Sequence, residues 1–100
     1  AAYARRRTIV LDGLAALNLP TGAPQGAFYA FPDIRSTGLT DEVFAERLLT
    51  EERVAVIPGS SFGASGVGHV RICYATSEEN LREALVRIGR FVAKARGVAA

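Results

Sequence analysis

The chain has 100 residues, of which twelve are basic and ten acidic, so its formal net charge is +2 at pH 7. A hydrophobic fraction of 49% excludes a disordered chain, and this length suffices for one domain with one modest core. The balanced charge does not favour a nucleic-acid partner, and no apolar run approaches the ~20 residues that span a bilayer, so we expect no membrane partner either.

The first predicted element is a helix over residues 2–17. Asp12 interrupts its apolar stretch, which argues against a secretory signal peptide. No N-cap or turn signal precedes the helix, so we expect that it begins inside a longer chain. Its predicted face combines apolar residues at helical spacing with two residues upstream of them: Val10, Leu14, Leu17, Tyr3 and Arg7.

The basic run Arg5–Arg7 in this helix allows two interpretations. Three positive charges can contact nucleic acid, but at the end of an amphipathic helix they usually form a solvated face. We favour the solvated face.

The segment 18–26 is predicted to be a loop, because two Pro and two Gly in nine residues interrupt any regular element. An aromatic-rich strand follows over 27–31, and Pro32 ends it. Thr40 is then expected to cap a second helix with two acidic residues in its first turn. The buried stripe of that helix is predicted to consist of Phe44, Ala45, Leu48 and Leu49.

The second half of the chain is predicted to contain two strands and a third helix. Apolar residues predict strands over 54–58 and 70–75, joined by a flexible glycine-rich loop over 59–68. Thr76 and Glu79 fit a capping box at the start of the last helix. The buried face of that helix is predicted to consist of Leu81, Leu85, Ile88, Val92 and Ala95.

The predicted order is α-β-α-β-β-α in one domain. Two strands joined by a glycine-rich connection are expected to be antiparallel neighbours. We therefore predict an α/β (α+β) fold, a two-layer sandwich with a small, mostly antiparallel sheet and the helices packed on one face.

Arg71 lies in the middle of an apolar strand, where an unpaired guanidinium is costly to bury. Side chains alternate along a strand, so Val70, Ile72 and Tyr74 point one way and Arg71 points to the opposite, mixed face. Arg71 could face solvent or pair with a carboxylate, since two-layer sheets often leave one face wet, and the pattern alone favours this interpretation. The alternative is anion recognition, because a guanidinium binds a carboxylate with two parallel hydrogen bonds.

The glycines of the segment 59–68 also allow a phosphate-binding interpretation. Phosphate cradles usually run from a strand into a helix N-terminus, whereas this loop runs into a strand. Its glycine spacing matches neither G-x-G-x-x-G nor the P-loop, so we favour a hairpin connection.

Cys73 is the only cysteine and His69 the only histidine. One thiol cannot form an intramolecular disulfide, so we expect a reducing, cytoplasmic location. Cys73 is expected to be buried and inert, and the two residues form no catalytic pair by any local rule. Together they cannot fill a structural zinc site, so no metal is expected.

Four stretches together resemble a known family: "YARRRTIVLDGL", "GAFYAFPDI", "VAVIPGSSFG" and "HVRICYATSEENLREALVRIGRF". Their order is similar to that in the C-terminal small domain of class I/II, fold-type I, pyridoxal-phosphate-dependent aminotransferases of the aspartate-aminotransferase-like branch. The resemblance runs from about residue 3 to residue 95 and is most specific in "VRICYATSEENL". It implies that residues 1–100 are this small domain, a fragment without the large cofactor-binding domain.

The resemblance implies that Arg71 binds the α-carboxylate of the amino-acid or 2-oxo-acid substrate. Tyr29 would line the substrate end of the site and Phe62 would pack beside Arg71, although core or hinge packing is the alternative for both. The Lys that forms a Schiff base with pyridoxal phosphate would lie upstream, and Lys94 does not match it. We therefore expect this chain to hold no catalytic residue and no cofactor, to be inactive alone, and to belong to a homodimeric enzyme.

Two other functions stay open from the sequence. Relatives with the same fold carry out lyase or synthase chemistry, since a fold does not determine a reaction. The predicted order would also suit a self-contained, non-catalytic small-molecule-binding module. The preferred amino acid is not apparent from the sequence.

Overall fold

The structure, a computed structural model, describes residues 2–21 and 29–97, with side chains described from residue 4 onward. Within these residues the predicted order of helices and strands is confirmed, and short 3₁₀ turns are added. The helices are α1 (Ala2–Ala16), α2 (Asp41–Glu52) and α3 (Glu78–Ala95). The strands are β1 (Tyr29–Ala30), β2 (Ile57–Pro58) and β3 (Val70–Cys73). The 3₁₀ turns are η1 (Arg35–Thr37), η2 (Gly59–Phe62) and η3 (Ala64–Gly66).

The three strands form an antiparallel sheet in the order β1-β3-β2. The central strand β3 pairs Cys73 with Tyr29 on one side and Arg71 with Ile57 on the other. The predicted antiparallel pairing across the glycine-rich loop is therefore confirmed. β2 and β3 are shorter than predicted. Before β2, Arg53 ends α2 in the left-handed conformation (φ 59°), and the chain pairs with β3 only from Ile57 onward. Parts of the predicted loop 18–26 and strand 27–31, namely residues 22–28, lie outside the described residues.

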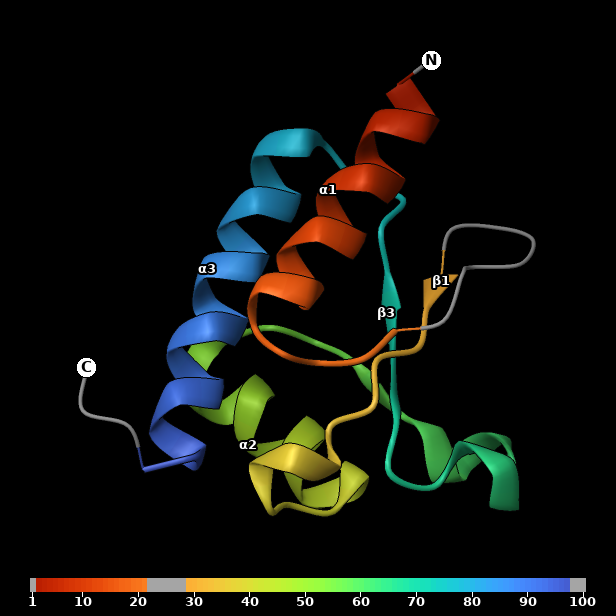
Figure 1. The fold of residues 1–100 in the computed structure, drawn as a ribbon, viewed down its shortest axis with the longest axis vertical. Helices are drawn as coiled ribbons and strands as arrows, with labels where there is room; N and C mark the ends of the chain where they lie inside the picture. The colour runs from red at the N-terminus through yellow and green to blue at the C-terminus, as the bar shows by residue number, and fades with distance from the viewer. Residues whose placement is uncertain (1, 22–28, 98–100) are drawn as a thin grey trace.

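The helices cover one face of the sheet, as predicted (Figure 1). α1 and α3 lie side by side and run in the same direction, while α2 packs against both α3 and β2. The strands turn Ala30, Val70 and Ile72 toward these helices, and all three are buried. The sheet therefore has one face in the core and one face away from the helices.

Most of the predicted helical core is confirmed. The buried predicted positions are Val10, Leu14, Phe44, Ala45, Leu48, Leu81, Ile88 and Val92. Leu17 and Leu85 are partly buried against the core. Phe91 was not predicted, yet it is fully buried and packs edge-on against Phe44 with ring centroids 5.2 Å apart.

One predicted core position is wrong. Leu49 is 52% exposed, because it lies at the edge of the α2 stripe, where the helix turns toward solvent. Arg7, which shares the helical spacing of Val10 and Leu14, is exposed, as is usual for a charged side chain. The side chain of Tyr3 lies outside the described residues.

The predicted capping box of α3 is wrong by one residue. Ser77, not Thr76, is the N-cap, and its side chain accepts a hydrogen bond from the backbone N–H of Asn80 at 3.1 Å. Thr76 instead accepts a hydrogen bond from the Asn80 side chain at 3.3 Å. Two adjacent hydroxyl residues make the pattern ambiguous, and the backbone decides which of them caps the helix.

Arg96 ties the ends of α1 and α3 together. Its guanidinium donates to the backbone carbonyls of Leu17 (2.7 Å) and Asn18 (3.2 Å), which follow the last turn of α1. It also donates to the hydroxyl of Ser36 at 2.6 Å. One side chain thus satisfies carbonyl groups that the end of a helix leaves without partners.

None of the helices in the described residues is both long and apolar enough to cross a membrane.

Candidate functional site

The face of the sheet that points away from the helices carries one charged side chain among apolar ones. We call this the open sheet face and define it by Tyr29, Phe31, Ile57, Arg71 and Cys73. The three apolar members Tyr29, Phe31 and Ile57 are 37%, 44% and 40% exposed. Strand alternation places Arg71 on this face, as the sequence predicts.

Arg71 lies against two aromatic rings at the centre of the open sheet face. Its guanidinium carbon is 4.2 Å from the centroid of the Tyr29 ring and 4.7 Å from that of the Phe62 ring. Both distances are within the ~6 Å at which a cation is attracted to an aromatic face. The structure therefore brings together the three residues that the resemblance singled out.

The N–H groups of Arg71 have no partner among the described residues. No described carboxylate forms an ion pair with this guanidinium, whereas Arg35, Arg47 and Arg90 each pair with one. A half-buried guanidinium with free donors can accept an anion without first breaking an internal ion pair.

Phe62 reaches Arg71 from the end of η2, and a buried carboxylate holds that turn. Asp41, which is 4% exposed, accepts a hydrogen bond from the backbone N–H of Ser60 at 2.7 Å. Burial alone would raise the pKa of Asp41. Hydrogen bonds, first from the Ser60 amide and hydroxyl and then from the amides of Asp41 itself and Gly68, together outweigh burial and hold the pKa below its usual value. Asp41 therefore stays ionised and links the first turn of α2 to η2.

The glycine-rich segment contains two 3₁₀ turns, η2 and η3, where the sequence predicts a loop without regular structure. η2 and η3 fold back on each other, and the backbone N–H of Gly59 donates to the carbonyl of His69 at 2.7 Å. A Cβ on Gly59 would lie 2.0 Å from the carbonyl oxygen of Gly66. Two backbone segments approach this closely only because neither residue has a side chain.

The phosphate-binding alternative for this segment is not supported by its backbone. Several N–H groups that such a cradle would offer are used internally, since Gly63, Gly66 and Val67 each donate to a carbonyl three residues earlier. The N–H of His69 likewise donates to the carbonyl of Gly66 at 3.1 Å. These amides are not available to an anion, and the segment instead brings Phe62 to Arg71.

Cys73 is exposed, which corrects the prediction of a buried thiol. The alternation that places Arg71 on the open sheet face also places Cys73 there, two residues further along β3. The general tendency of cysteine to be buried does not apply to a strand with one uncovered face.

His69 takes part in neither a catalytic pair nor a metal cluster among the described residues. Its Nδ1 lies 3.2 Å from the carbonyl oxygen of Val67. The nearby carboxylate of Asp33 is bound by Arg35, whose hydrogen bond lowers its pKa to about 2. No group of three metal-ligating side chains occurs in the described part of the chain.

The basic run of α1 does not form a free cationic patch. Arg5 pairs with Glu78 at the start of α3, with 3.0 Å between Nη2 and Oε1. Arg6 is partly buried, and Arg7 alone of the three is exposed without an ion pair among the described residues. The favoured interpretation of a solvated helix end fits this arrangement.

Lys94, the only lysine in the sequence, lies away from the open sheet face. Its ammonium pairs with Glu51 between α2 and α3. Hydrogen bonds from Arg47 and then Lys94 lower the pKa of Glu51 to about 2. This lysine therefore has a structural partner within the helical layer.

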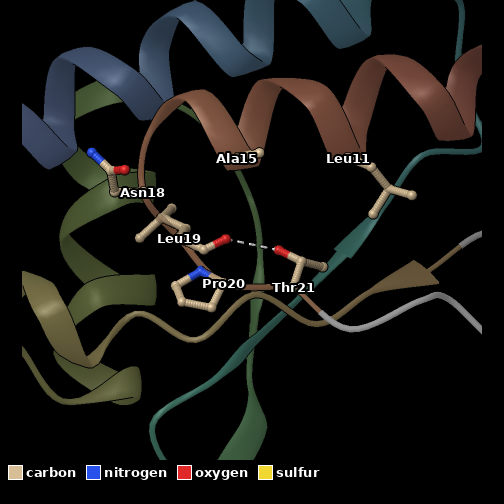
Figure 2. Close-up of a pocket in the computed structure, with 6 residues that line it drawn as sticks. All are labelled: Leu11, Ala15, Asn18, Leu19, Pro20 and Thr21. Atoms are coloured by element: carbon tan, nitrogen blue, oxygen red, sulfur yellow. Dashed lines mark hydrogen bonds between the residues drawn. The ribbon is translucent and has the colours of Figure 1, made fainter.

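A pocket lies at the end of α1, and Figure 2 shows its lining. The residues around it are Leu11, Ala15, Asn18, Leu19, Pro20 and Thr21. Thr21 uses its hydroxyl locally, donating to the carbonyl of Leu19 at 3.0 Å (Figure 2). The lining has no ionisable side chain, so this pocket has no charged group that could bind an ionic ligand, whereas Arg71 is such a group.

Comparisons of the sequence with known proteins all point to one family. The family described as aminotransferase class I and II matches residues 1–88. The aspartate aminotransferase of Pyrococcus abyssi is 54% identical over 86 residues, which are 86% of this chain and 22% of that protein. The aromatic-amino-acid aminotransferase 2 of Thermococcus litoralis is 50% identical over 86 residues, again 86% and 22%.

Solved structures agree with the sequence comparison. The aromatic aminotransferase of Pyrococcus horikoshii matches with a TM-score of 0.89 and 53% identity over 98% of this chain and 26% of that one. The aspartate aminotransferase of Thermus thermophilus, solved with maleate, matches with a TM-score of 0.80 and 52% identity over 89% of this chain and 22% of that one. The chain thus spans about a quarter of the length of these relatives.

Proposed function

The chain belongs to the class I and II aminotransferase family, and on this premise we propose that it forms the C-terminal small domain of an enzyme that transfers an amino group between an amino acid and a 2-oxo acid. The observation that carries the proposal is Arg71, half-buried on the open sheet face with its N–H groups free among the described residues. In this proposal Arg71 binds the substrate α-carboxylate. The relative solved with maleate, a dicarboxylate, supports a site of this chemistry.

The contribution of Arg71 is binding and orientation. A guanidinium binds a carboxylate through two parallel hydrogen bonds, which fixes both the position and the direction of the substrate. Because binding already holds the reacting groups in the productive geometry, the chemical step does not have to meet the entropy cost of bringing them together.

The cofactor belongs to the remainder of the enzyme in this proposal. When bound there, pyridoxal phosphate supplies the electron-withdrawing chemistry that amino-group transfer needs. The described residues do not offer a place for it, since Lys94 is paired with Glu51 and the amides of the glycine-rich segment are used internally. The 100-residue chain by itself is therefore proposed to be inactive, and the complete enzyme to be a cytoplasmic homodimer.

Substitution of Arg71 in the complete enzyme tests the proposal. We expect Arg71→Gln to lower kcat/KM for amino-acid substrates by about 10- to 150-fold, the equivalent of one charge-assisted hydrogen-bonded contact. The preference for an amino acid over its amide, which lacks the carboxylate, should fall by a similar factor. Steady-state kinetics with 2-oxoglutarate as amino-group acceptor gives both values.

Arg82→Gln is the matched control, because Arg82 is an exposed arginine on α3. It should leave both values unchanged. An Arg71→Gln enzyme with unaltered discrimination between acid and amide would refute the role of Arg71. A complete enzyme that eliminates or condenses its substrate without transferring the amino group would instead favour lyase or synthase chemistry.

A further inference from the structure

We infer that Tyr29 and Phe62 are positioning residues for Arg71, with Asp41 holding Phe62 in place through the η2 turn. The inference rests on the proposed function of Arg71 as a carboxylate clamp. These three residues would keep the half-buried guanidinium of Arg71 in one place and leave its hydrogen-bond donors available.

The two rings hold Arg71 by a contact that does not use its N–H groups. The distances of 4.2 and 4.7 Å join the guanidinium carbon to the ring centroids of Tyr29 and Phe62, so attraction is to the aromatic faces. A carboxylate partner would orient Arg71 equally well, but it would occupy the donors and compete with a substrate carboxylate. Aromatic support avoids that competition.

The rings come from two separate segments, so their meeting at Arg71 depends on the fold. Tyr29 is in β1, which pairs with β3, and Phe62 ends η2. Phe31 in turn packs edge-on against Phe62, with ring centroids 6.1 Å apart and an interplanar angle of 83°. Arg71 thus lies within a small aromatic cluster on the open sheet face.

A hydrogen bond to the buried carboxylate of Asp41 fixes the 3₁₀ turn that carries Phe62. Ser60, two residues earlier in the same 3₁₀ turn, donates its backbone N–H to the carboxylate of Asp41. The close approach of Gly59 and Gly66 fixes the other side of the turn. A displacement of η2 would therefore carry Phe62 away from Arg71.

The test measures equilibrium binding of maleate to the complete enzyme, together with KM and kcat for an amino acid. Tyr29→Leu and Phe62→Leu remove the aromatic face and keep an apolar side chain. We expect each to raise the Kd for maleate and the KM by about 2- to 30-fold, with a smaller change in kcat, because the loss is of an attraction to a cation. Tyr29→Phe and Phe62→Tyr, which keep the ring, should restore wild-type values.

Phe31→Leu is the matched control on the same surface. It removes an exposed ring that packs against Phe62, whereas the cation–π contacts of Arg71 among the described residues are with Tyr29 and Phe62. Its Kd for maleate should change less than that of Phe62→Leu. Equal effects of the two substitutions would mean that general packing of the surface, not the contact with Arg71, determines binding, and would overturn the inference.

A double-mutant cycle tests the role of Asp41. If Asp41 acts through Phe62, Asp41→Asn and Phe62→Leu should each weaken maleate binding, and the double variant should be no weaker than Phe62→Leu alone. Asp41→Asn keeps an oxygen acceptor for Ser60, so it is the variant expected to fold, and circular dichroism checks this. Full additivity of the two substitutions would contradict the link through η2.

The outcomes separate this inference from the proposed function. If Arg71→Gln weakens maleate binding while Tyr29→Leu and Phe62→Leu do not, the inference is overturned and the carboxylate clamp stands. If Arg71→Gln itself leaves the Kd unchanged, the proposed function of Arg71 fails and the inference fails with it.

Discussion

At the scale of single residues, Arg71 is held differently from the arginines that pair with carboxylates. Arg90 binds the buried carboxylate of Glu52 and so links α3 to α2, and Arg35 binds Asp33 with 2.6 Å between Nη2 and Oδ2. Arg71 instead lies against aromatic rings. Its hydrogen-bond donors are therefore not used by a carboxylate among the described residues.

A first prediction concerns the stability of a variant of Gly59. Gly59→Ala would place a methyl group 2.0 Å from the Gly66 carbonyl oxygen and 2.6 Å from that of His69, and backbone atoms cannot rotate away. We expect a loss of about 1–3 kcal/mol in the free energy of unfolding, measured by urea denaturation.

Gly89→Ala is the matched control, because its new Cβ would meet only the flexible end of Leu17, at 3.0 Å. Alanine also has the higher helix propensity, so the change in stability should be small. If Gly59→Ala were as stable as Gly89→Ala, the close approach between η2 and η3 would not exist in solution.

At the scale of elements, the start of α3 is determined by one hydroxyl group. Ser77→Ala removes the acceptor for the Asn80 backbone N–H, so we expect a loss of about 1 kcal/mol in the free energy of unfolding. Thr76→Ala removes only a side-chain contact near the surface and should cost clearly less. Thermal or urea denaturation of both variants measures the difference, and a larger loss in Thr76→Ala would assign the cap to Thr76 after all.

The contact between α2 and α3 predicts sensitivity to acid. Arg47 and Lys94 lower the pKa of Glu51 from its ordinary 4.5 to about 2, so the folded state favours the ionised carboxylate. This contribution to stability is complete above pH 4.5 and is lost as the pH falls from 4.5 toward 2. Glu51→Gln cannot titrate, so its free energy of unfolding should depend less steeply on pH in that window.

Urea denaturation between pH 2 and pH 7 measures both slopes. Glu46→Gln on the same helix is the control, because the Glu46 side chain forms no ion pair among the described residues. It should keep the wild-type dependence on pH. Identical slopes for wild type and Glu51→Gln would show that the two cations do not stabilise this carboxylate in solution.

At the scale of the whole molecule, the two faces of the sheet differ. One is covered by the helices (Figure 1). The other exposes Tyr29, Phe31, Ile57 and, beside it, Phe62. Grouped apolar side chains on a surface commonly mark a place where another protein surface packs. An exposed apolar face of this kind agrees with the finding that the chain covers only about a quarter of the length of its relatives.

We therefore expect the 100-residue chain to self-associate as its concentration rises. Phe31→Ser should weaken the association, since Phe31 is 44% exposed on the open sheet face. Val86→Ser on α3, where Val86 is 61% exposed, should not. Sedimentation velocity over a range of concentrations measures this, and a chain that stays monomeric throughout would contradict the expectation.

Local patterns in the sequence determined the elements and the face of Arg71. Helical spacing identified most buried positions of α2 and α3, and strand alternation placed Arg71 opposite Val70 and Ile72, because both periodicities follow directly from backbone geometry. The same alternation puts Cys73 on the face of Arg71. The expectation of a buried thiol followed the average tendency of cysteine instead, and the structure corrects it.

Tertiary structure alone decided which distant residues meet. The sequence contains no local signal that Asp41 would bind Ser60 or that Phe91 would pack against Phe44, because these contacts join separate elements. Tyr29 and Phe62 were singled out only by resemblance to a family, and their contact with Arg71 arises from strand pairing and from the folded η2 turn. A periodic pattern reports which face of its own element is apolar, whereas a site is formed by side chains that the fold brings together from several elements.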